Sequence, residues 1–177
     1  VCEFGADIPG ADAPHYLPAM AADQGVERTL DATLFVPYTQ DARAHLRPVH
    51  FRADIANVNR CVGTLLGHEV TKAHPEGLPD GAITIDCDGS AGQSFGAFLP
   101  AGVTLNVRGD ANDYFGKGLS GGVVSVRPPE GATFKFDENI IVGNVAFYGA
   151  TGGRGFANGL AGQRFGVRNS GATLVVE

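Results

Sequence analysis

The chain has 177 residues, enough for one domain with a sizeable core. Apolar residues make up 44% and charged residues 18%, a composition typical of a globular protein and not of a disordered one. The formal net charge of −6, without a basic run or a long apolar stretch, argues against nucleic acid and membranes as partners.

The cysteines argue against a disulfide framework and against a structural zinc site. Cys2, Cys61 and Cys87 are an odd number, lie far apart in the chain and lack C-x-x-C spacing. We therefore expect plain thiols in a reducing compartment, and hence a cytoplasmic protein.

The first fifty residues show little periodicity. We expect at most short helices here, near "YLPAMAAD" (16–23) and "TQDARAHL" (39–46). The interruptions are prolines, which end or kink regular elements: Pro9, Pro14, Pro18 and Pro37. The segment is expected to be an irregular arm.

Clear patterns begin after it. "VHFRADI" (49–55) alternates apolar and polar residues and predicts a half-buried strand. "NVNRCVGTLLGHEV" (57–70) has the apolar spacing of one helix face, and "HPEGLPDG" (74–81) has the composition of a turn that ends the helix.

The second half repeats itself. "FGAFLPAGVTLNV" (95–107), "FGKGLSGGVVSV" (115–126) and "FGVRNSGATLVV" (165–176) share a Phe-Gly start, a turn and an alternating strand, and a fainter copy starts at Phe147. The period is near 20 residues once the excursion "PPEGATFKFDEN" (128–139) is subtracted. Such a period without helices predicts a solenoid, in which strands of successive coils pair in parallel.

Glycine suits the corners of such coils, because it adopts positive φ and permits close backbone approach. We expect corners at Gly92, Gly96, Gly102, Asn112, Asp113, Gly116, Gly118, Gly121, Gly122 and Gly171. We expect the following residues to lie largely inside: Phe95, Phe98, Leu105, Val107, Phe115, Val124, Val126, Phe147, Phe165 and Leu174.

Two glycine motifs match the residue spacing of a functional site but lack the helix that such a site needs after it. Gly116, Gly118 and Gly121 match the dinucleotide-binding G-x-G-x-x-G spacing, but a strand and prolines follow them where a helix is needed. "GQSFG" (92–96) matches a nucleophile elbow around Ser94, yet every histidine precedes Ser94 and no helix is expected after it. We favour corners in both cases.

Two polar clusters leave weak alternatives. In "HEVTKAH" (68–74) the histidines stand six apart, whereas a zincin motif needs them four apart, so we interpret the segment as an exposed helix end. Asp86 with Asp88, and Asp110 with Asp113, could serve as the acid–base pairs of a carbohydrate-active enzyme. The alternative is that such residues cap turns.

Several stretches together resemble a known family. "IANVNRCVGTLLGHEVTK", "GSAGQSFGAFLPAGVTLNVRGDANDYFGKGLSGG", "GNVAFYGATGG" and "FANGLAGQRFGVRNSGA" are similar to the C-terminal GXGXG domain of the large (α) subunit of glutamate synthase, over about residues 52–177. The resemblance implies an all-β right-handed parallel β-helix, with one lead-in strand and helix at about 52–80 and coils at 81–177. Residues 1–51 resemble a connector only weakly.

The resemblance also implies a function. That enzyme converts glutamine and 2-oxoglutarate into two glutamates, using FMN and an iron–sulfur cluster, and its β-helix holds the glutaminase and FMN domains in register. We expect this chain to be a structural scaffold in that enzyme, with no catalytic, cofactor-binding or metal-binding residue of its own. The alternatives are a free-standing β-helix subunit of a related redox complex or a carbohydrate-active β-helix enzyme.

The expected partners are the other domains of glutamate synthase. Asn59 and Arg60 stand at the start of the expected helix, where they could hold the connector or the other domains. The family domain usually continues with further coils, so the chain is expected to be truncated. An open coil edge near Leu174 and Val176 would then favour self-association.

Overall fold

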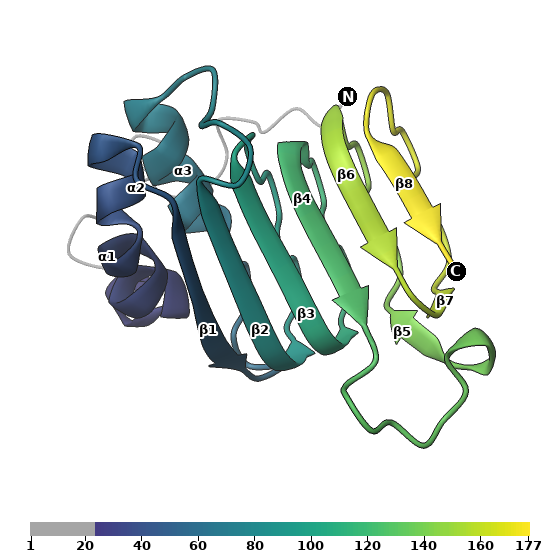
Figure 1. Cartoon of the computed structure of the whole chain (residues 1–177). Helices are drawn as coiled ribbons and strands as arrows, with labels where there is room; N and C mark the ends of the chain where they lie inside the picture. The colour runs from purple at the N-terminus through teal and green to yellow at the C-terminus, as the bar shows by residue number, and fades with distance from the viewer. Residues whose placement is uncertain (1–23) are drawn as a thin grey trace, which may run out of the picture.

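Eight parallel strands form one sheet, and helical segments gather beside its first strand (Figure 1). The computed structural model describes residues 24–177. The main strand order is β1-β2-β3-β4-β6-β8, while β5 pairs with β3 and β7. The strands are β1 (Val49–Ile55), β2 (Ile83–Ala91), β3 (Val103–Ala111), β4 (Ser120–Arg127), β5 (Ile140–Val142), β6 (Gly152–Ala157), β7 (Leu160–Ala161) and β8 (Thr173–Val176).

Helical turns precede β1 and one longer helix follows it. They are η2 (Val26–Arg28), η3 (Asp31–Phe35), α1 (Val36–Tyr38), α2 (Gln40–His45) and α3 (Thr64–Ala73), with a short η4 (Phe136–Glu138) in the excursion before β5. Pro37 lies in the first turn of α1, where its missing N–H is tolerated. Phe35 is fully buried and meets Phe51 of β1 edge-on, with 5.8 Å between ring centroids. Through Phe35, η3 therefore takes part in the hydrophobic core.

Alternation along each strand decides which side chains are buried. In β2 and β3 the residues Ile83, Ile85, Val103 and Leu105 are fully or almost fully buried, while the polar residues between them face outward. Ile85 pairs with Leu105, and Leu105 pairs with Val124. The repeat is thus 20 residues (85 to 105) and then 19 (105 to 124).

Turn segments between the strands also pair from repeat to repeat. The N–H of Ser94 donates to the carbonyl of Asp113 (2.9 Å), and the N–H of Tyr114 donates to Asn144 (2.9 Å). Both donor residues have left-handed backbones, with φ of +61° and +62°. These hydrogen bonds satisfy turn backbone that would otherwise need water.

The expected all-β class and right-handed parallel β-helix are wrong. The protein is an α/β fold, with one all-parallel sheet of eight strands and helices packed at its β1 end. The period predicted the parallel pairing of successive repeats, but it carried no information about the helices at residues 26–45. Helical turns there replace the expected irregular arm. A division of the chain at residue 52 stays a prediction.

Local expectations had mixed outcomes. The strand at 49–55 is confirmed as β1, and the short helix at 39–46 is confirmed as α2. The helix expected from residue 57 begins only at Thr64, because Cys61 and Gly63 have left-handed backbones with φ of +55° and +90°. The helix expected at 16–23 lies outside the described residues.

The expected core is largely confirmed, with one error. Phe95, Phe115 and Phe147 are fully buried and contact one another in series, with centroids 5.8 and 5.4 Å apart. Phe98 is 55% exposed, because the turn backbone there is left-handed (φ +59°) and directs the ring outward. Buried residues of the list also include Leu105, Val107, Val124 and Val126, whereas Phe165 and Leu174 are partly buried against the core.

Candidate functional site

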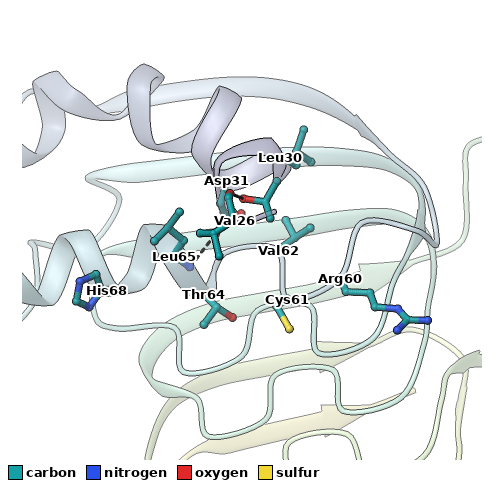
Figure 2. A pocket seen from close by; sticks show the side chains of 10 residues that line it. Val26, Leu30, Asp31, Arg60, Cys61, Val62, Thr64, Leu65 and His68 are labelled. Atoms are coloured by element: carbon teal, nitrogen blue, oxygen red, sulfur yellow. Dashed lines mark hydrogen bonds between the residues drawn. The ribbon is translucent and has the colours of Figure 1, made fainter. Parts of the chain in front are cut away.

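A mainly apolar hollow of about 300 Å³ lies where the helical turns before β1 meet the loop before α3 (Figure 2). Its walls come from two segments far apart in sequence, residues 26–31 and 60–68. Arg60 and the exposed Cys61 lie at the loop side of the hollow. The residues that give it apolar character are Val26, Leu30, Val62 and Leu65.

Asp31 fixes the geometry of this hollow. Its carboxylate accepts N–H groups of Gly63 (2.8 Å), Leu65 (2.9 Å) and Leu66 (3.1 Å), so it caps the N-terminus of α3 from a distant segment. The side chain is almost fully buried. Burial raises the pKa of the Asp31 carboxyl, and the three N–H donors lower it without cancelling that effect.

Arg60 is an exposed charged side chain in the lining of this hollow. It is exposed and has no hydrogen-bond or ion-pair partner among residues 24–177. In Figure 2 its guanidinium extends away from the apolar residues. Asn59 is used locally instead, because its Oδ1 accepts the N–H of Ala56 at 2.9 Å and closes the turn after β1.

The expected corner residues lie in the turns or at strand starts and ends, in two geometric groups. Positive φ occurs at Gly96, Gly102, Gly116, Gly118 and Gly121. A Cβ at Gly92, Gly122 or Gly171 would instead run into backbone oxygens of the preceding repeat. These geometries are consistent with a structural use of the glycines, and their role as corners stays a prediction.

Asn112 and Asp113 each form a hydrogen bond to another repeat. Asn112 Nδ2 donates to Asn57 Oδ1 (2.8 Å), and Asp113 Oδ1 accepts the N–H of Asn144 (2.8 Å). The carboxylate of Asp113 is therefore engaged with backbone and has no paired acid beside it among the contacts of the described residues. Asp110 likewise accepts the hydroxyl of Ser90 at 2.6 Å.

The remaining motifs do not assemble into a catalytic cluster. Ser94 sits in a left-handed turn that runs on into further turn residues, and no helix follows it. His74 Nε2 lies 2.6 Å from the carbonyl oxygen of Arg43, while His68 is exposed. Among residues 24–177, no group of three or more His, Cys, Asp or Glu side chains could hold a metal ion.

The described residues do not fit the cofactors that the resemblance implies for the whole enzyme. An iron–sulfur cluster needs several cysteine thiolates, but Cys61 is exposed and Cys87 is in the core. Burial, with a smaller contribution from Asp86 and Asp88, raises the pKa of Cys87 to about 12. The turn at Gly116 and Gly118 leads into β4, so it offers no helix N-terminus to an FMN phosphate. Cys2 lies outside the described residues.

No helix in the described part of the chain is both long enough and apolar enough to cross a bilayer. The pattern of the sequence indicated Arg60 as a contact but gave no sign of Asp31. The Asp31 cap joins positions 32 to 35 residues apart, and no local motif records such a contact.

The family model described as "GXGXG motif" matches residues 32–177. The chain is 56% identical to NADH glutamate synthase of Saccharomyces cerevisiae over 131 residues, 73% of this chain and 6% of that protein. It is 50% identical over 153 residues to the NADPH glutamate synthase large chain of Bacillus subtilis, covering 86% and 10%. For ferredoxin-dependent glutamate synthase 2 of Synechocystis the identity is 44% over 147 residues, covering 83% and 9%. The chain thus spans at most a tenth of these relatives.

Proposed function

We propose that this chain is a scaffold that holds other domains in register. It belongs to the GXGXG family and is the domain of that family found in glutamate synthases. The parent enzyme would convert glutamine and 2-oxoglutarate into two glutamates, with FMN and an iron–sulfur cluster carried by its other domains. This domain would contribute position and rigidity to that reaction, and no reacting group.

The observation that carries this proposal is the exposed Arg60, which has no partner among residues 24–177, beside an apolar hollow. An exposed arginine at the rim of an apolar depression is the usual anatomy of a protein–protein contact, because the apolar centre is desolvated and the guanidinium binds a carboxylate in two-pronged fashion. The Asp31 cap holds both walls of the hollow together, so the surface is pre-formed before a partner arrives. The partner we propose is another domain of the same synthase.

Repeat-to-repeat contacts support the scaffold role from a second direction. The side chains of Asn112 and Asp113 in the turns form hydrogen bonds between repeats, and the strand pairing runs continuously from β1 to β8. Such a close-packed stack deforms little along its length, which suits a spacer between catalytic domains. We also propose a cytoplasmic location, since Cys61 and Cys87 are both free thiols.

The experiment uses the full-length synthase that carries this chain. Glutamine hydrolysis, ammonia-dependent glutamate formation and glutamine-dependent glutamate formation are measured for Arg60→Ala, with Arg168→Ala as a matched control. Arg168 is also an exposed arginine, but it lies in the turn before β8. We expect both half-reactions to persist in Arg60→Ala while less glutamate forms per glutamine hydrolysed. An unchanged ratio would contradict the proposed contact.

The edge of β8 is a second contact surface that we propose. Along residues 173–176 this strand pairs with β6 and with no other described strand, and Val176 is 42% exposed. An unpaired parallel edge invites a further strand, from elsewhere in the same synthase or from a second copy. Sedimentation of the isolated chain would show concentration-dependent association, weakened in Val176→Lys. A monomer at all concentrations would contradict self-association.

A further inference from the structure

The outward face of the sheet carries a hydrogen-bonded polar row across its first four strands. His50 Nε2 lies 2.9 Å from Asp86 Oδ2, and Asn106 Nδ2 donates to Asp86 Oδ1 at 2.9 Å. The hydroxyl of Ser125 then donates to Asn106 Oδ1 at 2.7 Å. The row fixes the side chains at the centre of this face and uses the acceptor atoms of Asp86 and Asn106.

A second polar row lies two residues further along each strand and contains an ion pair. Arg108 Nε and Nη2 donate to the two oxygens of Asp88, both at 2.6 Å. Asp88 therefore has its carboxylate occupied by a two-pronged guanidinium contact. Asp86 and Asp88, the carboxylates at the centre of β2, are both engaged.

Two arginines on the same face remain without a partner. Arg52 is in register with Asp86, and Arg127 is in register with Arg108, so both stand on the outward face. Both are exposed, and no hydrogen bond or ion pair joins either of them to another of residues 24–177. Asp54, further along β1, is in register with Asp88 and forms no ion pair with Arg52.

These two arginines share one hollow. A polar depression of about 240 Å³ is lined by Arg52, Asp86, Asn106, Arg108, Ser125 and Arg127. Arg52 comes from β1 and Arg127 from β4, which are three strand spacings apart, about 14 Å between strand axes. Long arginine side chains can lean over that distance from both ends, while Asn106 and Ser125 lie between them.

We propose that this hollow binds a small dicarboxylate, with one carboxylate on Arg52 and the other on Arg127. The free hydrogen-bonding groups of the hollow are mainly guanidinium N–H donors, so they select a ligand that presents only acceptors. Two separated guanidinium groups match two separated carboxylates better than one compact anion. This site lies on the sheet face, apart from the hollow at Arg60, and does not depend on the scaffold role.

Arginine modification tests the site in the full-length protein. Phenylglyoxal reacts with accessible guanidinium groups, and peptide mass spectrometry gives a separate rate for each arginine. Succinate and glutarate are the probes, inorganic phosphate is the competing anion, and Arg168 in the turn before β8 is the internal control. At a ligand concentration about ten times Kd, we expect the rates at Arg52 and Arg127 to fall roughly tenfold, with Arg168 unchanged.

A variant separates bridging from independent binding. In Arg52→Gln, the dicarboxylate should no longer protect Arg127, because one anchor is lost; Arg168→Gln should leave that protection intact. Persistence of protection at Arg127 in Arg52→Gln would overturn the bridging site. Equal protection by phosphate would overturn the choice of a dicarboxylate. Arg52 and Arg127 that fail to react even without ligand would show that another domain covers the face, which also overturns the proposal.

Discussion

The ring of Phe147 occupies the space into which a Cβ atom at Gly116 would project. A Cβ built at Gly116 comes within 2.5 Å of both Cδ1 and Cε1 of that ring. The reason is that phenylalanine stands in one repeat where glycine stands in the others. The N–H of Phe147 donates to the carbonyl of Phe115, as the N–H of Gly116 donates to Phe95. Phe147 therefore stands at the glycine position of its repeat, and its ring fills the core place next to Phe115.

Gly116→Ala is expected to be strongly destabilising. The residue has φ of +63°, which costs an alanine about 1–2 kcal/mol, and the methyl would displace a fully buried ring at about 1–3 kcal/mol more. The matched control is Gly149→Ala, at φ of +65° with nothing within 4 Å of the added Cβ. Urea unfolding should show both losses of stability for Gly116→Ala, but only the backbone loss of about 1–2 kcal/mol for Gly149→Ala. Equal losses would contradict the steric role of Phe147.

Gly118→Ala should fall between these two variants. Its φ is +64°, and the new Cβ would come within 2.5 Å of the ring of Phe98. That ring is exposed, so it can rotate away, although it would then leave its cation–π contact with Lys117. We expect a loss of about 1–3 kcal/mol by urea unfolding. A thermal shift with NAD, FMN or ATP that disappears in Gly118→Ala would instead indicate a nucleotide loop.

The repeat could be predicted from the sequence because it depends on local chemistry. Phe-Gly followed by glycine and an alternating strand indicated where successive repeats pair, and "VHFRADI" gave β1 with its observed bounds. The Phe147 position was one residue out of phase, since Ala146 and not Phe147 aligns with Phe115. Spacing alone could not show this, because either residue of the pair "AF" could supply the apolar side chain.

The fold class and most of the site depend on contacts that no local pattern records. The helical turns at residues 26–38 bury Phe35 against Phe51, a contact between separate segments that local spacing does not record. Asp31 caps α3 across more than thirty residues. The exposure of Arg60 could be expected because an arginine in a turn next to a helix start is a local feature, whereas the apolar hollow beside it is not; the role of Arg60 as a contact stays a prediction.

Asp31→Ala is expected to destabilise the protein by about 2–4 kcal/mol. The change leaves the buried N–H groups of Gly63 and Leu66 and the part-buried N–H of Leu65 without this acceptor, and it removes the cap of α3. Asp41→Ala is the control, because that carboxylate is exposed and, within the described residues, contacts only His45, at 3.4 Å. Urea unfolding should give a change within about 0.5 kcal/mol for the control. A similar value for Asp31→Ala would contradict the cap.

Asp86 should make stability depend on pH in the acid range. Burial alone would raise the pKa of this carboxyl, but hydrogen bonds from Asn106 and His50, with the charges of His50 and Arg108, outweigh it and lower the pKa below 3.8. The contribution of the ionised group is therefore present above pH 3.8 and is lost as the pH falls through the lowered pKa. The stability gap between wild type and Asp86→Asn should shrink in that window. A gap that widened in acid would contradict the assignment.

The two described cysteines should differ sharply in reactivity, and the difference reports on the Arg60 surface. Cys61 is exposed at the hollow, whereas Cys87 is fully buried with its pKa raised to about 12, so little thiolate forms near neutral pH. In the isolated chain at about pH 8, iodoacetamide should label Cys61 and leave Cys87 unlabelled until urea unfolds the protein. In the full-length synthase the rate at Cys61 should fall, because the proposed partner domain covers the hollow, and Arg60→Ala should restore part of it. A rate at Cys61 that is the same in the isolated chain and in the full-length synthase would show that this surface stays open, and the inter-domain contact would then have to lie elsewhere.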